Sequence, residues 1–321
     1  TDGTIQKDLD DGIDTIGKKM TVCQLYAKQI RHRGNVRYNT KNGRKRLMKL
    51  LEEDKLGGCP IDSVKLSDAK EWAIRMKEKG ISYKTISNDK RSLKAAFYTA
   101  IQDDCIRKNP FDFQLNTVIE DDTEPKVPLT PAQEESFLSF AQNDKVYQKY
   151  YDELIILLGT GLRISELCGL TDTDIDFENR IINVDHQLLR SAETGYYIET
   201  PKTKSGIRQI PMSEKVYEAF NRVLKRRRGA KAVTIDGYSN FLFLNRDGYP
   251  KTATNYDGMF RGLAKKYNKY HEEALPKVMT PHTLRHTFCT NMANAGMNPK
   301  ALQYIMGHSN ITMTLNYYAH A

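Results

Sequence analysis

"TPHTLRHTF", residues 280–288, places two histidines and one arginine within about one and a half turns of a predicted helix. Thr280 is a good N-cap residue and the proline after it suits the first helical position, so a helix is expected to begin here. His282, Arg285 and His286 then share one side of that helix. Free backbone N–H groups and the positive end of the helix dipole favour an anion at this point. The segment predicts a phosphate site, although a solvated basic helix start remains an alternative.

The composition is that of a globular protein with room for two domains. The chain has 321 residues, of which 39% are hydrophobic. No apolar run approaches the roughly 18 residues that span a bilayer, and the polar, acidic first residues are unlike a signal peptide. We therefore expect a cytoplasmic protein that has no membrane partner.

Cysteine and histidine spacings do not indicate a metal site. The five cysteines are far apart and form no C-x-x-C pair. His282 and His286 are four residues apart, as in some zinc pairs, but the segment lacks the glutamate of an H-E-x-x-H motif. We expect no metal, and we expect His286 to pack behind the site.

Positive charge is concentrated in the first part of the chain. Residues 21–116 hold 21 Lys/Arg and 11 Asp/Glu, whereas the remainder holds 28 and 29. No basic amphipathic helix with an aromatic face accompanies this excess, so the charge indicates nucleic acid rather than a membrane. A basic domain that is merely soluble is the alternative.

Helical periodicity predicts a first domain over residues 20–117, after an N-terminal segment at 1–19. Helices are expected at 44–58, 67–80 and 83–110. Four basic residues lie on the outward face of the last of these helices: Lys84, Lys90, Arg91 and Lys94. They could hold DNA phosphates, or they could form only a solvated surface.

An acidic, proline-containing linker at 118–129 leads to a second domain at 130–321. Helices are expected to about residue 170 and again from 213, apart from an extended stretch with a turn at 239–250. Three short strands are expected between these helical regions, at 180–187, 195–200 and 207–211. The predicted fold class is therefore mostly α with a small antiparallel β-sheet (α+β).

Four other segments of the second domain carry polar groups that suit a phosphate. They are "TGLRISEL" (160–167) with Arg163 and Glu166, "ETPKTKSGIRQIP" (199–211) with Lys202 and Lys204, "MGHSN" (306–310) with His308, and "TLNYYAH" (314–320) with Tyr317 and Tyr318.

The ordered set G-L-R-x-S-E, a hairpin lysine, H-x-x-R-H, G-H and a tyrosine about ten residues later resembles the tyrosine recombinases, or phage-type integrases. The resemblance covers most of residues 130–321, and the helical first domain resembles the core DNA-binding domain of that family. The stretches "DDCIRKNPFDFQL", "HQLLR" and "GYYIETPKTKSG" most resemble integrases of conjugative transposons of the Tn916 and Tn1549 kind. Each motif alone is a weak signal, whereas five in this order are a strong one.

The resemblance implies a phosphate-binding role for three residues. Arg163 and Arg285 match the paired arginines, whose forked donors stabilise charge on a pentavalent phosphorus without a metal. His308 matches the third phosphate-contacting position. His282 matches the histidine that helps to move the proton of the nucleophile. Glu166 is expected to orient Arg163.

The resemblance also implies the groups that attack and leave. Lys202 matches the hairpin lysine that would protonate the departing 5′ oxygen, with Lys204 in reserve. Tyr318 would attack to give a 3′-phosphotyrosyl link. We prefer Tyr318 to Tyr317 because Tyr318-Ala-His320 resembles the Tyr-x-His ending of the family, but the doublet leaves Tyr317 open. The covalent link conserves the bond energy, so no cofactor is expected.

The family further implies a C-clamp of two domains around double-stranded DNA, a homo-oligomer (a dimer or a synaptic tetramer) and an excisionase-type accessory factor. The expected function is site-specific recombination that integrates and excises a mobile element. A type IB topoisomerase shares this chemistry and is one alternative. The other is a catalytically inactive DNA-binding architectural or regulatory protein of the same fold.

Overall fold

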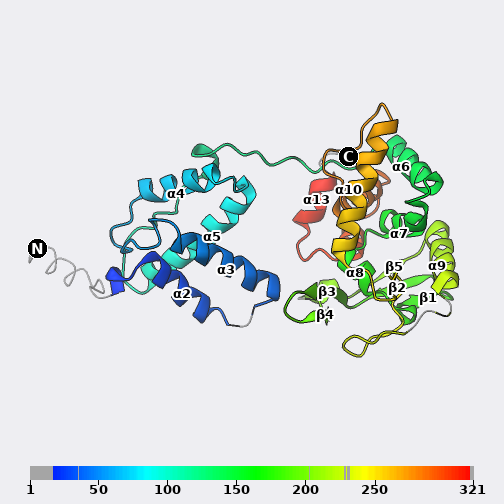
Figure 1. Ribbon diagram of the computed structural model, residues 1–321, viewed down its shortest axis with the longest axis horizontal. Helices are drawn as coiled ribbons and strands as arrows, with labels where there is room; N and C mark the ends of the chain where they lie inside the picture. The colour runs from blue at the N-terminus through cyan, green and yellow to red at the C-terminus, as the bar shows by residue number, and fades with distance from the viewer. Residues whose placement is uncertain (1–16, 35, 202, 228, 230–231, 319–321) are drawn as a thin grey trace, which may run out of the picture. The chain divides into compact units, whose positions relative to one another are not determined.

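The computed structural model describes residues 17–34, 36–201, 203–227, 229 and 232–318. The chain divides into two compact units, Thr1–Glu124 and Pro125–Ala321 (Figure 1). This boundary lies within the linker expected at 118–129. None of the described helices is both long enough and apolar enough to cross a membrane.

The first unit is a helical bundle around one apolar core. Its α-helices are α2 (Val22–His32), α3 (Tyr38–Glu52), α4 (Leu66–Glu78) and α5 (Tyr83–Gln102), with short 3-10 helices at Gly17–Lys19 and Leu115–Thr117. Trp72 and Phe97 pack against Phe111 with ring centroids 5.7 and 5.4 Å apart. The side chains of Thr21 and Ser82 cap the first turns of α2 and α5.

Three helix boundaries in this unit differ by six or more residues from the sequence prediction. Helix α3 runs from Tyr38 to Glu52 rather than over 44–58. Its polar first turns carry no apolar periodicity, so the sequence did not indicate them, and residues 53–58 form turns after the helix. Helix α5 ends at Gln102 rather than at 110. Asp104, two residues further on, has a φ of 54°, a left-handed conformation that cannot continue a helix.

The second unit surrounds a helix that is buried on nearly every side. Helix α7 (Tyr151–Thr160) holds the apolar run "LIILL", every residue of which is buried, and it packs against three other helices. The helices of this unit are α6 (Pro131–Asn143), α7, α8 (Ile164–Gly169), α9 (Glu214–Arg227), α10 (Ala253–Tyr270), α11 (Pro281–Asn294), α12 (Pro299–Met306) and α13 (Thr312–Tyr318). The short 3-10 helices are η3 (Gln148–Tyr150), η4 (Asp172–Asp174) and η5 (Lys204–Gly206).

Two small antiparallel sheets complete the second unit. One has the strand order β1 (Ile175–Asp176), β2 (Ile181–Val184) and β5 (Arg208–Pro211); the other pairs β3 (Gln187–Ser191) with β4 (Gly195–Glu199). In the register, Ile182 faces Ile210 and Leu188 faces Ile198. The mostly helical fold class with antiparallel strands is confirmed.

Strand β3 was missed, and the strand expected at 180–187 ends at Val184. Buried His186 explains the break, because its Nε2 lies 2.7 Å from the carbonyl oxygen of Gly169 and ties this turn to the end of α8. "QLLRS" has no clear alternation of apolar and polar residues, so its sequence did not indicate a strand.

Candidate active site

Two helices of the second unit end at glycines with left-handed backbones. Helix α7 ends at Gly161 (φ 64°) and α12 ends at Gly307 (φ 62°). A Cβ atom on Gly161 would lie 2.5 Å from Cδ1 of Phe288, and one on Gly307 would lie 3.0 Å from the carbonyl oxygen of Ser205. Only glycine therefore fits both ends. The last carbonyl groups of each helix have no partner within the helix and carry its negative dipole end.

Arg285, on α11, joins these two helix ends. Its Nη1 donates to the carbonyl oxygen of Gly161, and its Nη2 donates to that of Met306. The side chain is buried, and burial, followed by the positive charge of Arg163, lowers the pKa of Arg285 to about 9. The guanidinium remains protonated at neutral pH, in a place where a further anion would stabilise it.

Arg163 reaches the same end of α12 from the start of α8. Its Nη2 donates to the carbonyl oxygen of Gly307 at 3.0 Å, and its Nη1 donates to Oε1 of Glu166 at 2.7 Å. Its backbone N–H donates to Oε2 of Glu166 at 2.8 Å, so the same carboxylate caps α8. The expected pair of arginines thus converges on neighbouring carbonyl groups, and Glu166 orients Arg163 as predicted.

A third arginine, which the sequence analysis did not single out, completes this cluster. Arg208, at the start of β5, donates through Nη1 and Nη2 to the two carboxylate oxygens of Glu166, at 3.0 and 2.8 Å. Burial by itself would raise the pKa of Glu166, but the hydrogen bonds and charge of Arg208, and then the charge of Arg163, lower it to about 2. One buried carboxylate therefore faces three arginines, and positive charge is in excess.

His308 follows directly after Gly307 and is also buried. Its Nδ1 lies 3.0 Å from Oγ1 of Thr314 on α13. Burial, and then the charges of Arg285 and Arg163, lower the pKa of His308 to about 4. The imidazole is therefore neutral at pH 7 and can donate a hydrogen bond to an oxygen atom of a ligand.

The two histidines of α11 lie in different surroundings. His282 is an exposed residue. Desolvation of its imidazole by neighbouring atoms lowers its pKa, and the positive charges of Lys126 and Arg285 lower that pKa further. The half-buried ring of His286 meets the ring of Tyr317 edge to face, with centroids 4.9 Å apart. His286 thus packs beside one of the two candidate tyrosines.

The tyrosine doublet at the end of α13 points in two directions. The hydroxyl of Tyr318 donates to the carbonyl oxygen of Met297, at the loop before α12. Burial raises the pKa of Tyr317, as does Cys289, whereas the positive charge of Arg285 lowers it. For Tyr318, burial and Cys289 raise the pKa. The charge of Arg285 is therefore felt by Tyr317, the residue that the sequence analysis placed second.

The two candidate lysines lie in the segment between β4 and β5. Lys202 lies outside the described residues, so its predicted role stays a prediction. Lys204 is exposed and begins the short helix η5. The carbonyl oxygen of Gly206, two residues later, accepts a hydrogen bond of 3.2 Å from Nη1 of Arg208, so this segment is tied to the arginine cluster.

Comparison with known proteins decides the family. Residues 128–321 match the phage integrase family. The chain is also 69% identical, over 317 residues, to the transposase of transposon Tn916 from Enterococcus faecalis, an alignment that covers 99% of this chain and 78% of that protein. The chain belongs to the phage integrase family. Its class as a tyrosine recombinase of the transposon-integrase type, expected from the sequence motifs, is confirmed.

Solved structures of this integrase family agree. The integrase of transposon Tn1549, in complex with a circular intermediate DNA, is 78% identical with a TM-score of 0.91, covering 94% of this chain and 96% of that one. A lambda integrase dimer bound to a COC′ core site is 16% identical with a TM-score of 0.60, covering 91% and 92% of the two chains. This second likeness shows a shared fold.

The basic residues predicted to bind DNA all lie on α5 of the first unit. Lys84 and Arg91 are exposed. Lys94 forms a 2.5 Å ion pair with Asp112, and the ammonium group of Lys90 lies 4.5 Å from the ring centroid of Phe113. Two of the four, Lys84 and Arg91, are therefore exposed to solvent, and Lys90 and Lys94 are partly covered.

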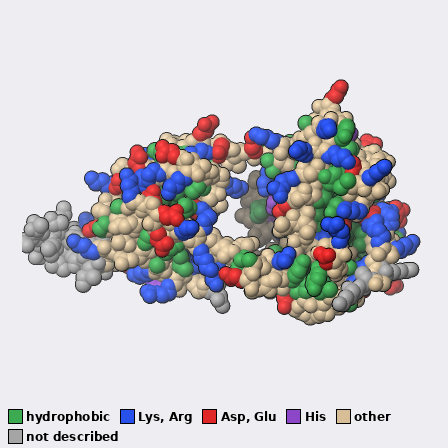
Figure 2. All heavy atoms as spheres, viewed as in Figure 1, with side chains coloured by type: hydrophobic (Ala, Val, Ile, Leu, Met, Phe, Trp, Pro, Cys, Tyr) green, Lys and Arg blue, Asp and Glu red, His purple; other side chains and the backbone are tan. Residues whose placement is uncertain are grey.

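A second basic surface of the first unit was missed by the sequence analysis. A groove of about 560 Å³ between α2 and α3 is lined by Lys41, Arg44, Lys45 and Lys49. An ion pair of 2.5 Å between Arg46 on α3 and Asp89 on α5 places these two helices side by side. Lysine and arginine side chains are spread over much of the visible face of this unit (Figure 2). The run of basic residues at 41–49 was the available signal.

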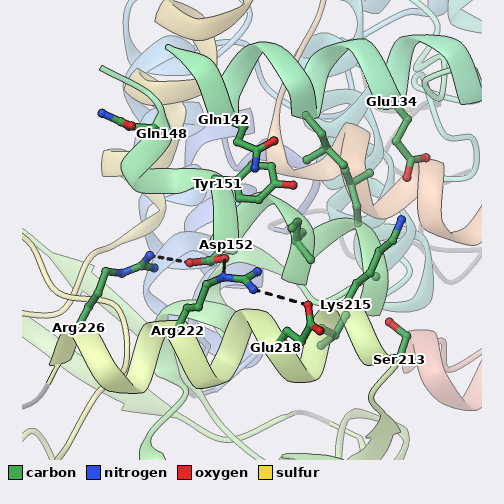
Figure 3. Close-up of a pocket in the computed structure, with 15 residues that line it drawn as sticks. Glu134, Gln142, Gln148, Tyr151, Asp152, Ser213, Lys215, Glu218, Arg222 and Arg226 are labelled. Atoms are coloured by element: carbon green, nitrogen blue, oxygen red, sulfur yellow. Dashed lines mark hydrogen bonds and ion pairs between the residues drawn. The ribbon is translucent and has the colours of Figure 1, made fainter. Parts of the chain in front are cut away.

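A pocket of about 590 Å³ lies between α6, α7 and α9 and has no lining residue in common with the arginine cluster. Arg222 and Arg226 point from α9 toward Asp152 on α7, with nitrogen–oxygen distances of 2.8 and 2.6 Å (Figure 3). Glu218 is 3.7 Å from Arg222. These ion pairs fasten α9 to the central helix, so we interpret this part of the pocket as structural.

Proposed function

We propose that this integrase cuts and rejoins double-stranded DNA at one phosphate held by Arg163, Arg285 and His308. One observation carries the proposal: these side chains converge on the end of α12, where positive charge exceeds negative charge. The structures of the Tn1549 integrase contain circular intermediate DNA or transposon right end DNA. We propose ends and circular junctions of a mobile element as the DNA substrate here too.

The arginines suit the charge that develops during the reaction. Attack on phosphorus places negative charge on two nonbridging oxygens, and guanidinium groups stabilise it through charge-assisted hydrogen bonds. Each guanidinium carries five N–H donors, more than the side-chain bonds described above use. Neutral His308 donates a further hydrogen bond. This chemistry needs no metal ion.

We propose Tyr317 as the nucleophile, in place of Tyr318. Tyr317 packs against His286 and is influenced by the charge of Arg285, whereas the hydroxyl of Tyr318 is bonded to a backbone carbonyl group. The Tn1549 integrase was solved with an arginine-to-lysine and a tyrosine-to-phenylalanine substitution at its own positions 225 and 379, which are 154 residues apart. Arg163 and Tyr317 have that same separation in this chain.

In the proposed step, the phenol oxygen of Tyr317 bonds to phosphorus as the bond to the 5′ oxygen breaks. His282 accepts or relays the phenol proton, and a lysine of the β4–β5 segment, Lys202 or Lys204, protonates the departing oxygen. The phosphotyrosyl bond keeps the energy of the phosphodiester bond. A 5′ hydroxyl group can therefore reverse the step and rejoin the strand.

Exchange of strands between duplexes requires more than one cut. We therefore propose that the chain acts as a homo-oligomer, a dimer or a tetramer, on DNA. An excisionase-type accessory factor that sets the direction is part of the proposal and rests on the resemblance to transposon integrases. Because the substrate is cellular DNA, a cytoplasmic location is proposed with it.

A duplex nicked just downstream of the scissile phosphate tests this function, because the short fragment released with a 5′ hydroxyl group diffuses away and leaves the protein trapped on the 3′ phosphate. We expect a covalent adduct with the wild-type chain and with Tyr318→Phe, and none with Tyr317→Phe, which should still bind the duplex. Chelation with EDTA should leave the yield unchanged. If the adduct were lost in Tyr318→Phe and kept in Tyr317→Phe, Tyr318 would be the nucleophile.

The same material separates the two alternatives. Binding of the duplex without any adduct would indicate an architectural or regulatory protein. Relaxation of supercoiled DNA without joining of two duplexes would indicate a type IB topoisomerase. Either result would contradict the proposed recombinase.

A further inference from the structure

Three consecutive carbonyl groups at the end of α12 each accept a hydrogen bond from a different arginine. Arg208 Nε donates to the carbonyl oxygen of residue 305 at 2.6 Å, Arg285 to that of residue 306, and Arg163 to that of residue 307 at 3.0 Å. These carbonyl groups belong to the last turn of the helix, which has no partners for them. The residue that follows is His308, so the three bonds together fix where its backbone lies, and Thr314 holds its ring.

We propose that Arg208 is a positioning residue for the cleavage reaction, an inference that rests on the proposed function. Arg208 holds Glu166 against Arg163, and it holds the end of α12 that carries His308. It thereby sets the distance between these two phosphate-binding groups. The guanidinium of Arg208 acts through its neighbours and does not touch the DNA.

The burial of Arg208 shows that its role exceeds that of a core residue. Its side chain is 0% exposed, and it shares the inward face of β5 with Ile210. A buried guanidinium beside two other arginines is costly, and replacing both members of a buried ion pair by apolar residues of similar size is commonly tolerated, whereas removing one member leaves the other buried without its partner. A requirement for folding alone would therefore be met by apolar residues at both positions 166 and 208.

The hydrogen bonds of Glu166 explain how Arg208 would control Arg163. The two carboxylate oxygens accept two bonds from Arg163, through its backbone N–H and Nη1, and two bonds from Arg208. A carboxylate has about four lone-pair sites, so these bonds fix its orientation. Without Arg208, the carboxylate could rotate and draw the fork of Arg163 away from the phosphate.

Close packing connects Arg208 to the second half of the site. A Cβ atom on Gly307 would lie 3.1 Å from Nη1 of Arg208, so the backbone there rests against the guanidinium. The same nitrogen donates to the carbonyl oxygen of Gly206 at 3.2 Å, in the segment that carries Lys204. Displacing Arg208 would therefore move several groups of the site together.

The test compares Arg208→Met and Arg208→Lys with the wild-type chain on two nicked duplexes. One duplex has an ordinary scissile phosphate. The other has a methylphosphonate, which lacks one charged oxygen and depends less on arginine for its transition state. Single-turnover rate constants for adduct formation, relative to wild type on the same duplex, are the readout.

For Arg208→Met we expect the rate constant to fall about 10- to 100-fold on the phosphate and less than about threefold on the methylphosphonate. Arg208→Lys keeps the positive charge but loses the branched guanidinium donors. Its rate constant on the phosphate duplex should lie between those of Arg208→Met and the wild type. Arg227→Met is the matched control, because it removes an arginine bond to the carbonyl oxygen of Phe241 outside the cluster. For that variant, the rate constant relative to wild type should be the same on the two duplexes.

Equal losses on the two duplexes, in proportion to the loss of folded protein measured by circular dichroism, would overturn the inference and leave Arg208 a structural residue. An unchanged rate on the phosphate in both variants would overturn it as well. If the wild-type chain forms no adduct on the phosphate, the proposed function fails, and this inference fails with it.

Discussion

At the scale of single residues, the site is organised by positive charges that the fold keeps close together. Arg163 and Arg208 share one buried carboxylate, Glu166, and all three arginines, Arg285 included, bond to carbonyl groups at two helix ends. Helix ends supply partial negative charge without adding a full negative charge that would compete with a phosphate. The cluster therefore stays intact while an excess of positive charge remains for DNA.

The lowered pKa of His308 leads to a prediction for stability against pH. Its folded value of about 4 lies below the ordinary value of 6.5, so the unfolded chain takes up the proton first as the pH falls. The contribution of His308 to the free energy of unfolding is therefore fully present above about pH 6.5, and it decreases as the pH falls toward 4. For Glu166, with a pKa of about 2, the corresponding loss occurs only below about pH 4.5.

Urea unfolding at pH 7 and pH 5 measures this effect. Between pH 7 and pH 5, the free energy of unfolding of His308→Gln should fall by up to about 2 kcal/mol less than that of the wild-type chain. His32→Gln, at an exposed position of the first unit, is the control and should keep the full pH dependence. The same pH dependence in His308→Gln as in the wild type would contradict the account of this buried ring.

The sequence predicted the members of the site unevenly, for physical reasons. Arg163, Arg285 and His308 follow marked helix boundaries, so their motifs could be recognised. Arg208 was missed because a charged residue in a strand is normally assigned to solvent; only its position two residues before apolar Ile210, on the same strand face, indicated an inward position. Adjacent tyrosines on a helix point about 100° apart, so packing, which the sequence does not reveal, must decide between them.

At the scale of elements, α7 connects the core to the site. Asp152 in its first turn forms ion pairs with α9. Its C-cap residue is Gly161, whose carbonyl oxygen accepts a hydrogen bond from Arg285. The boundaries of such elements were predictable where caps were present, as at Thr130 and Thr280. They were not predictable at β3, where a contact between His186 and α8 sets the strand.

We expect Asp152→Ala to destabilise the second unit by about 1–3 kcal/mol, because it leaves Arg222 and Arg226 without their shared buried acceptor. Thermal unfolding measures the change. Glu218→Ala is the matched control: this exposed partner of Arg222 should contribute less than about 0.5 kcal/mol. Equal melting temperatures for the two variants would show that the buried pair does not fasten α9 to α7.

At the scale of the whole molecule, the two units differ in the charged residues that they carry. The first carries the excess of basic residues, and the second carries the arginine cluster. Composition and periodicity were enough to predict the fold class. The C-clamp stays a prediction.

Salt dependence tests the role of the first unit. The logarithm of the DNA-binding constant should fall with the logarithm of salt concentration by about 0.9 for each neutralised phosphate. Replacing exposed Lys84 and Arg91 together by alanine should reduce this slope by about 1.8, measured by fluorescence anisotropy with a labelled duplex.

The control for that measurement replaces Lys55 and Lys79, two exposed lysines that lie outside α5, by alanine. It removes the same total charge and should leave the slope nearly unchanged. If the two double variants lowered the slope equally, the effect would come from net charge, and α5 would not be a DNA-binding face.

Mass spectrometry of the protein–oligonucleotide adduct, after digestion of both parts, tests the central claim most directly. We predict that the peptide from α13 carries one 3′-linked nucleotide on Tyr317, and that the yield is the same with and without EDTA. A nucleotide on any residue other than Tyr317 or Tyr318, or an adduct that forms only with added metal ions, would contradict a metal-free site built from arginines around one DNA phosphate.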